Sequence, residues 1–147
     1  SMNNIDDFLL KINDIEKIIN YKFSNKDLLI KSFTHPSHNN KINYEQLEFL
    51  GDSIINFQTT SWLYAKKSSF NSGKLSIKRA QIINNKLLAD IIKLLNLESY
   101  ILVGKNVDVN TKICSDVYEA LIAAIYLDSN ISKTFTFFHD NFPKHLL

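Results

Sequence analysis

The chain has 147 residues, the size of a single domain with its own hydrophobic core. Hydrophobic residues make up 45% of it and charged residues 22%, which is ordinary for a soluble globular protein. The formal net charge of +2 permits nucleic-acid binding but does not argue for it. The longest apolar run, residues 120–127, is far shorter than the roughly 20 residues of a membrane-spanning helix, so no membrane association is expected.

Cys114 is the only cysteine, which excludes an intramolecular disulfide and a cysteine metal site. This suits a reducing, intracellular setting, and we expect a cytoplasmic location ahead of a nuclear or organellar one. Cys114 itself is interpreted as a small apolar filler. Ser1 in front of Met2 indicates a remnant of tag removal, and residues 3–147 are predicted to form one domain.

Two amphipathic helices are predicted in the first third of the chain. Apolar residues at helical spacing predict a helix over residues 6–20. Ser24 is the expected N-cap of a second, short helix, which should end before Pro36 because the residue before a proline avoids the α region. His35 and His38 raise the option of zinc, but no H-x-x-x-H helix or cysteine partner supports it. His35 is instead expected to make a structural hydrogen bond.

A long helix is predicted from Asn43 to about Lys66. Glu45, Glu48 and Asp52 fall within one narrow stripe of it at 3.6 residues per turn. Apolar residues are expected to bury much of the rest of the helix: Leu47, Phe49, Leu50, Ile54 and Phe57. Clustered carboxylates on a buried helix repel one another and call for a divalent cation, Mg²⁺ or Mn²⁺. A solvated acidic stripe on a surface helix explains this stretch equally well.

Gly51 lies inside the long helix, where glycine costs about 1 kcal/mol relative to alanine. The expected gain is close approach of another helix or of a second subunit.

Two further helices are predicted over residues 74–83 and 86–95. Lys78 and Arg79 are candidates for contacts with phosphate groups. A solvated face, or for Arg79 an ion pair that supports the acidic cluster, has equal weight.

A second acidic segment strengthens the cation hypothesis. Residues 97–112 are predicted to be a loop with a short turn of helix, in which Lys112 either contacts phosphate or is solvated. Residues 113–128 predict a helix that is apolar nearly all round and carries Asp116 and Glu119 three positions apart. Two buried helices with acids on one face can pool their carboxylates. Such a pool suits one or two Mg²⁺ ions for in-line attack on a phosphodiester.

A terminal apolar helix is predicted over residues 131–142, with Pro143 as its stop. No strand pattern of four or more residues competes with these helices. The predicted fold class is therefore all-α.

Four segments carry a family resemblance. The stretch Y-E-Q-L-E-F-L-G-D (Tyr44–Asp52) resembles the ribonuclease III signature E-R-L-E-F-L-G-D. The stretch D-V-Y-E-A-L-I-A-A-I-Y-L-D (Asp116–Asp128) resembles that family's second acidic motif. The stretches F-T-H-P-S (Phe33–Ser37) and L-S-I-K-R-A-Q-I-I-N-N-K-L-L-A (Leu75–Ala89) resemble two further motifs of the family, in the same order.

The resemblance implies roles for the acidic residues of the two motifs. Glu48, Asp52, Asp116 and Glu119 match the residues that bind Mg²⁺, for which Mn²⁺ is expected to substitute. Asp52 and Glu119 are expected to be catalytic. Glu45 matches a position that helps to bind RNA or to shape the site, a group in which we also place the basic candidates Lys78, Arg79 and Lys112.

The resemblance further implies a Mg²⁺-dependent endonuclease that acts on double-stranded RNA in RNA processing and leaves 5′-phosphate and 3′-hydroxyl ends. It implies a homodimer, with Phe49 packed into the partner subunit. Substrate choice would rest on A-form shape and 2′-hydroxyl groups rather than on base sequence. Gln46 replaces the usual arginine of the signature and Ala123 the usual glycine of the second motif, but neither change removes a cation ligand.

Two alternatives are weighed against the enzyme. A non-catalytic, RNA-binding or ribosome-associated relative would keep the fold, but such relatives lose acids that are all in place here. An acid-rich helical interaction module without a metal does not explain the spacing of both motifs. No double-stranded-RNA-binding domain is expected in the chain, which is then a trimmed protein, a stand-alone catalytic domain or a piece of a Dicer-like protein.

Overall fold

The computed structural model describes residues 1–143, which contain seven α-helices, one short 3₁₀-helix and no β-strand beyond isolated bridges. This confirms the predicted all-α class. The helices are α1 (Ile5–Ile19), α2 (Lys26–Ser32), α3 (Glu45–Lys66), α4 (Ser72–Ile82), α5 (Asn85–Leu94), the 3₁₀-helix η1 (Glu98–Tyr100), α6 (Thr111–Asp128) and α7 (Ile131–Asn141). None of the helices in this part of the chain combines the length and the apolar character needed to cross a bilayer.

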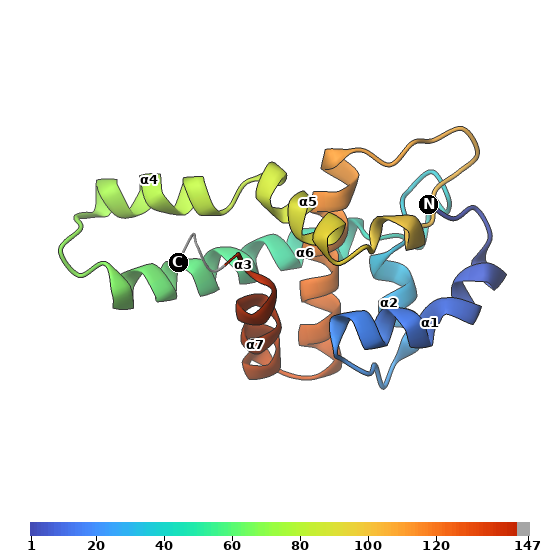
Figure 1. The fold of residues 1–147 in the computed structure, drawn as a ribbon, viewed down its shortest axis with the longest axis horizontal. Helices are drawn as coiled ribbons and strands as arrows, with labels where there is room; N and C mark the ends of the chain where they lie inside the picture. Colours follow the sequence, from blue (N-terminus) through green and yellow to red (C-terminus); the bar gives the residue numbers. More distant parts are fainter. Residues whose placement is uncertain (144–147) are drawn as a thin grey trace.

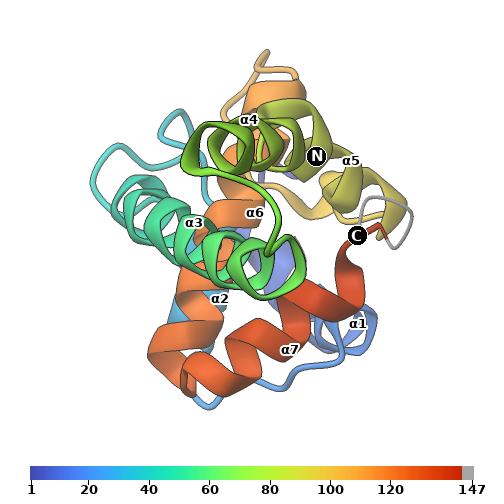
Figure 2. The ribbon, with the colours of Figure 1, turned by 90° about the vertical axis from the view of Figure 1, so that its left-hand side faces the viewer.

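Helix α6 forms the centre of the molecule (Figures 1 and 2). Every residue from Ile113 to Ile125 is buried, and α6 packs against α2, α3, α5 and α7. Cys114 is fully buried in this helix, as predicted. A helix that is apolar all round needs neighbours on every side, which is why the other helices surround it. Asp116 and Glu119 of α6 are therefore carried into the core.

Asparagine side chains begin most of the helices. The residue before each of α1, α2, α4, α5, α6 and α7 is an asparagine whose side-chain oxygen accepts a backbone N–H of the first turn. This satisfies one of the amide groups that a helix start leaves unpaired. The prediction that Ser24 caps the second helix is wrong, because Asn25 does so. Helix α6 likewise begins at Thr111, ahead of the predicted start at residue 113.

Helix α3 is buried on one side only. Leu47 and Ile54 are in the core as predicted, whereas Phe49 and Phe57 are 80% and 61% exposed. The second half of α3 extends away from the main body with α4 beside it (Figure 1). The expectation that Phe49 and Phe57 are buried within the chain is therefore wrong. The Phe49 ring is exposed to solvent, whereas the Phe57 ring lies 6.1 Å from the ring of Phe135.

The segment between α5 and α6 is the predicted loop with a short helical turn, η1. Leu102 ties this loop to the loop after α2. Its N–H donates to Phe33 O at 2.8 Å, and its C=O accepts from His35 N at 2.9 Å. These backbone hydrogen bonds fix the chain that leads into α3.

Candidate functional site

Three carboxylates meet where α3 crosses α6. Glu48 comes from α3, and Asp116 and Glu119 come from α6. One carboxylate oxygen from each of the three lies within 4.8 Å of the others. Asp116 and Glu119 are 6% and 7% exposed, and Glu48 is half-buried. The pooling of acids that the two motifs predict is thus present for these three residues, and a solvated stripe is excluded for them.

Gly51 brings the two helices close enough for this meeting. A Cβ atom placed on Gly51 would lie 1.8 Å from the carbonyl oxygen of Glu119, far inside van der Waals contact. Of the two explanations offered for a glycine at this position, close approach of another helix is therefore confirmed. The same contact sets the position of Glu119 relative to α3.

The cluster is short of positive charge. Burial, and then the Asp116 carboxyl group beside it, raise the pKa of Glu48 to about 7, although Lys112 acts in the opposite direction. Burial, and then the neighbouring Asp52, raise the pKa of Glu119 to about 9. Both shifts have the sign expected for carboxylates that lose water and face one another. A bound cation would reverse them.

Asp52 and Glu45 flank the cluster on α3. Asp52 is exposed, one turn after Glu48, and is close enough to Glu119 to raise its pKa. Its Oδ1 and backbone carbonyl also face the amide of Asn56, at 3.5 and 2.9 Å. Glu45 is exposed in the first turn of α3, outside the group of three. Asp52 can thus approach an ion held by the group, whereas the role of Glu45 stays a prediction.

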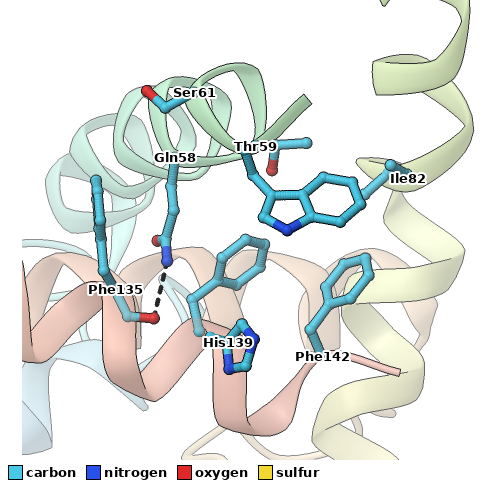
Figure 3. Close-up of a pocket in the computed structure, with 9 residues that line it drawn as sticks. Gln58, Thr59, Ser61, Ile82, Phe135, His139 and Phe142 are labelled. Carbon is cyan, nitrogen blue, oxygen red and sulfur yellow. Dashed lines mark hydrogen bonds between the residues drawn. The ribbon is translucent and has the colours of Figure 1, made fainter. Parts of the chain in front are cut away.

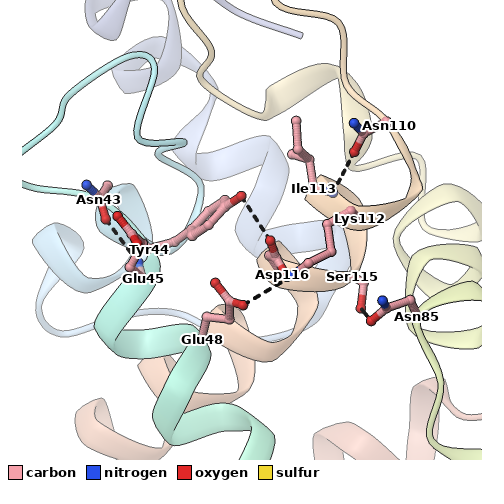
Figure 4. Close-up of polar contacts among 10 residues, drawn as sticks. All are labelled: Asn43, Tyr44, Glu45, Glu48, Asn85, Asn110, Lys112, Ile113, Ser115 and Asp116. Atoms are coloured by element: carbon pink, nitrogen blue, oxygen red, sulfur yellow. Dashed lines mark hydrogen bonds and ion pairs between the residues drawn. The ribbon is translucent and has the colours of Figure 1, made fainter.

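Lys112 and Tyr44 contact the cluster directly (Figure 4). The Lys112 ammonium makes ion pairs with Asp116 Oδ1 and with Glu48 Oε1, the latter at 3.5 Å. The Tyr44 hydroxyl donates to Asp116 Oδ2 at 3.2 Å. The sequence places Lys112 one turn before Asp116, but only the fold reveals its second partner. The sequence analysis assigns no role to Tyr44. Its position directly before Glu45 in the acidic signature is the one feature of the sequence that could have pointed to it.

Lys78 and Arg79 lie on α4, away from the carboxylates. The Arg79 guanidinium donates to Thr60 Oγ1 at 2.9 Å. Thr60 is twelve residues after Glu48 on α3, about 18 Å along the helix axis. Among residues 1–143 no ion pair joins Arg79 to the acidic cluster, so that alternative is wrong. The proposed contacts of Lys78 and Arg79 with RNA stay a prediction.

His35 makes the structural hydrogen bond predicted for it. Its Nδ1 accepts from the backbone N–H of Ser37 at 3.0 Å, and its ring packs edge-on against Tyr44. Burial lowers the pKa of His35, so its ring is neutral at physiological pH. The three-residue group in the described part of the chain contains no histidine, and the zinc option has no support.

Stability of the cation-free protein is expected to fall as the pH rises from about 4.5 to about 9. The folded state keeps protons on Glu48 and Glu119 up to pKa values of about 7 and about 9, whereas the unfolded chain releases both near 4.5. The folded state therefore binds more protons across this interval, and each rise in pH favours unfolding. Thermal unfolding in EDTA at several pH values measures the effect.

Glu119→Gln is the matched control for this pH dependence. The variant has one fewer carboxyl group with a raised pKa, so its melting temperature should fall less over the same pH interval. A wild-type melting temperature that stays constant or rises between these pH values would contradict the electrostatic description of the cluster.

Comparisons with known proteins point to one family. The family model for ribonuclease-III-like domains matches residues 25–146. Ribonuclease 3 of Francisella philomiragia is 41% identical over 119 residues, which are 79% of this chain and 51% of that protein. Ribonuclease 3 of Rickettsia massiliae is 36% identical over 132 residues, 82% of this chain and 58% of that protein. The chain thus spans about half the length of these curated relatives.

Solved structures give the same result. One structure of the nuclease domain of ribonuclease III from Campylobacter jejuni superposes on this chain with a TM-score of 0.82 at 33% identity. The matched region covers 88% of this chain and 94% of the Campylobacter chain. It is described as showing structural flexibility in a region involved in dimer formation. A second structure of that domain gives a TM-score of 0.78 at 32% identity. With the family model matched over most of its length and the acidic residues of both motifs on α3 and α6, the chain belongs to the ribonuclease III family.

Proposed function

We propose that this chain is the catalytic part of a Mg²⁺-dependent endonuclease that cleaves double-stranded RNA by phosphodiester hydrolysis. The products would carry 5′-phosphate and 3′-hydroxyl ends, and the activity would serve RNA processing. The observation that carries the proposal is the meeting of Glu48, Asp116 and Glu119 oxygens within 4.8 Å. Family membership and the names of the relatives, which are ribonucleases, support it.

The donor set fits a hard divalent cation. Three carboxylates offer oxygen ligands of the kind that Mg²⁺ and Mn²⁺ prefer. A positive charge at the point where Glu48 and Glu119 meet would lower their raised pKa values. Glu48, Asp116 and Glu119 would hold the ion, and Asp52 would complete the site from the exposed side of α3. When bound, Mg²⁺ supplies an activated water and neutralises the leaving oxygen.

The protein's own residues would orient the substrate. Lys112 is paired with two of the carboxylates and Glu45 lies one turn before Glu48 on α3, whereas Lys78 and Arg79 lie on α4. Basic residues at this separation would contact phosphates of an RNA duplex at a distance from the cleaved bond. Recognition of A-form shape in this way requires no base contacts.

A homodimer is part of the proposal. Phe49 is 80% exposed one residue after Glu48, and aromatic residues are enriched at protein–protein interfaces. A cavity of about 360 Å³ lies between α3 and α7, lined by Phe135, Phe138 and Phe142 and by Gln58 and Trp62 (Figure 3). Its apolar lining suits an aromatic side chain, and Phe49 of a second copy is the candidate occupant.

Phe49→Ala is expected to weaken the dimer by roughly 2 kcal/mol, or about thirtyfold in the dissociation constant. Removal of the ring takes away apolar contact with the second copy but leaves the folded monomer intact, because Phe49 is exposed within the chain. Sedimentation velocity over a range of low concentrations measures the change. Leu10→Ala is the control, since Leu10 is 81% exposed on α1. An unchanged sedimentation profile for Phe49→Ala would refute the interface.

Cleavage of a labelled RNA duplex tests the function as a whole. The protein is incubated with the duplex in Mg²⁺ and in EDTA, with a single-stranded RNA of the same sequence as control. The proposal expects cleavage of the duplex in Mg²⁺ only, and products that a 5′-phosphate-dependent exonuclease degrades. Binding of the duplex without cleavage in saturating Mg²⁺ would favour the non-catalytic RNA-binding alternative.

A further inference from the structure

Lys112 brings a positive charge to two of the carboxylates. Its ammonium lies between Asp116 Oδ1 and Glu48 Oε1, so that one charge bridges α6 and α3. Among residues 1–143, the ion pairs of Glu48 and of Asp116 are made with this lysine alone. The Lys112 side chain is 61% exposed, whereas those of Glu48 and Asp116 are 25% and 8% exposed. The Lys112 ammonium therefore lies at the protein surface, and the two carboxylates that it pairs with are more deeply buried.

Tyr44 holds the other side of Asp116. Its hydroxyl donates to Asp116 Oδ2, and the side chain is only 3% exposed. Its backbone N–H donates to Thr34 O at 3.0 Å, and its ring packs against His35. Burial and the charge of Asp116 raise the pKa of Tyr44, so the hydroxyl stays a neutral donor. The two oxygens of Asp116 thus have different partners, one fixed in the core and one on a flexible, exposed stem (Figure 4).

We propose that Lys112 is a displaceable internal counterion, which bridges Glu48 and Asp116 in the cation-free protein and leaves them when a divalent cation binds, whereas Tyr44 positions Asp116 in both states. This inference rests on the cation site of the proposed function. The lysine ammonium and the divalent cation need the same carboxylate oxygens, so their binding is competitive. A lysine head on a four-carbon stem can move into solvent at little cost.

Removal of the Lys112 charge and removal of the Tyr44 hydroxyl should change the affinity for a divalent cation in opposite directions. Removal of the Lys112 charge leaves the carboxylates unpaired in the cation-free protein, which becomes less stable. The same removal takes away the competitor, so the divalent cation binds more tightly. Removal of the Tyr44 hydroxyl leaves Asp116 without its fixed donor, and a ligand without its orienting partner binds metal more weakly, by roughly 10–100-fold.

Calorimetric titration with MnCl₂ and thermal unfolding in EDTA test the exchange. Lys112→Met should bind Mn²⁺ about tenfold more tightly than wild type, equivalent to about 1.4 kcal/mol, and should melt at a lower temperature in EDTA. Tyr44→Phe should bind Mn²⁺ at least about tenfold more weakly. Lys105→Met, an exposed lysine in the loop before α6, and Tyr64→Phe, an exposed tyrosine on α3, should match wild type in both measurements.

The outcomes separate this inference from the proposed function. If wild type binds Mn²⁺ and Lys112→Met binds it equally or more weakly, the counterion exchange is refuted and the cation site stands. Equal affinity of Tyr44→Phe and wild type would refute the positioning role of Tyr44. If the wild-type protein binds no Mn²⁺, both the proposed cation site and the counterion exchange are refuted. Tighter binding by Lys112→Met with lower stability in EDTA supports the exchange, because a purely structural lysine would not improve affinity.

Discussion

Glu119→Gln is expected to abolish RNA cleavage, with a loss of roughly a thousandfold or more, while the fold and the dimer persist. The amide keeps the shape of the side chain but cannot supply the negative oxygen that a divalent cation needs. The loss corresponds to about 4 kcal/mol of transition-state stabilisation, in line with the several kcal/mol that a bound cation contributes. Single-turnover cleavage of an RNA duplex in Mg²⁺ measures it.

The control for this variant is Glu98→Gln, which changes an exposed carboxylate on η1, outside the cluster. It should cleave at the wild-type rate. Helical circular dichroism and sedimentation should be unchanged for both variants, since Glu119 lies at the edge of the core and the amide fills the same space. Cleavage by Glu119→Gln at the wild-type rate would show that Glu119 is not a cation ligand.

Gly51→Ala is expected to destabilise the fold by at least about 3 kcal/mol. The added methyl group would lie 1.8 Å from the Glu119 carbonyl oxygen, which belongs to the backbone of the central helix and cannot move aside as a side chain would. Helices α3 and α6 must separate to admit it, and this moves Glu48 away from Glu119. Chemical denaturation measures the lost stability, and cation affinity should decrease with it.

Gly73→Ala is the matched control for this change. Gly73 lies in the first turn of α4, and a Cβ there would meet only the Asn71 side chain, at the ordinary distance of 3.4 Å. Alanine should be neutral or stabilise the protein by roughly 0.5–1 kcal/mol, because it reduces the freedom of the unfolded chain. Equal stability of the two alanine variants would contradict the close contact between α3 and α6.

The sequence predicts the helices well and their first residues less well. The sequence predicts all seven α-helices, and apolar periodicity is clearest where a helix buries a stripe or the whole of its surface, as α1 and α6 do. The starts depend on capping, and in a chain rich in asparagine no single asparagine stands out as a cap. Asn25 rather than Ser24 begins α2, and Asn110 begins α6 ahead of its predicted start, so that Lys112 lies in its first turn.

The acidic residues of the site could be predicted because both motifs carry them at helical spacing. The neighbours that hold them could not all be predicted, because they come from different segments. Glu48 and Lys112 are 64 positions apart, and Tyr44 and Asp116 are 72 apart. Phe49 illustrates another limit: an apolar residue on a helix that is apolar on several sides can face the core or the solvent, and periodicity does not distinguish the two.

Anomalous X-ray scattering from crystals of this protein soaked with MnCl₂ would locate a cation held by Glu48, Asp116 and Glu119. Binding of the cation by these carboxylates with release of Lys112 predicts a peak within coordination distance, about 2 Å, of oxygens of Glu48, Asp116 and Glu119, with the Lys112 ammonium moved away from Asp116. Absence of a peak between α3 and α6 at saturating Mn²⁺, with Lys112 still bridging Glu48 and Asp116, would contradict it.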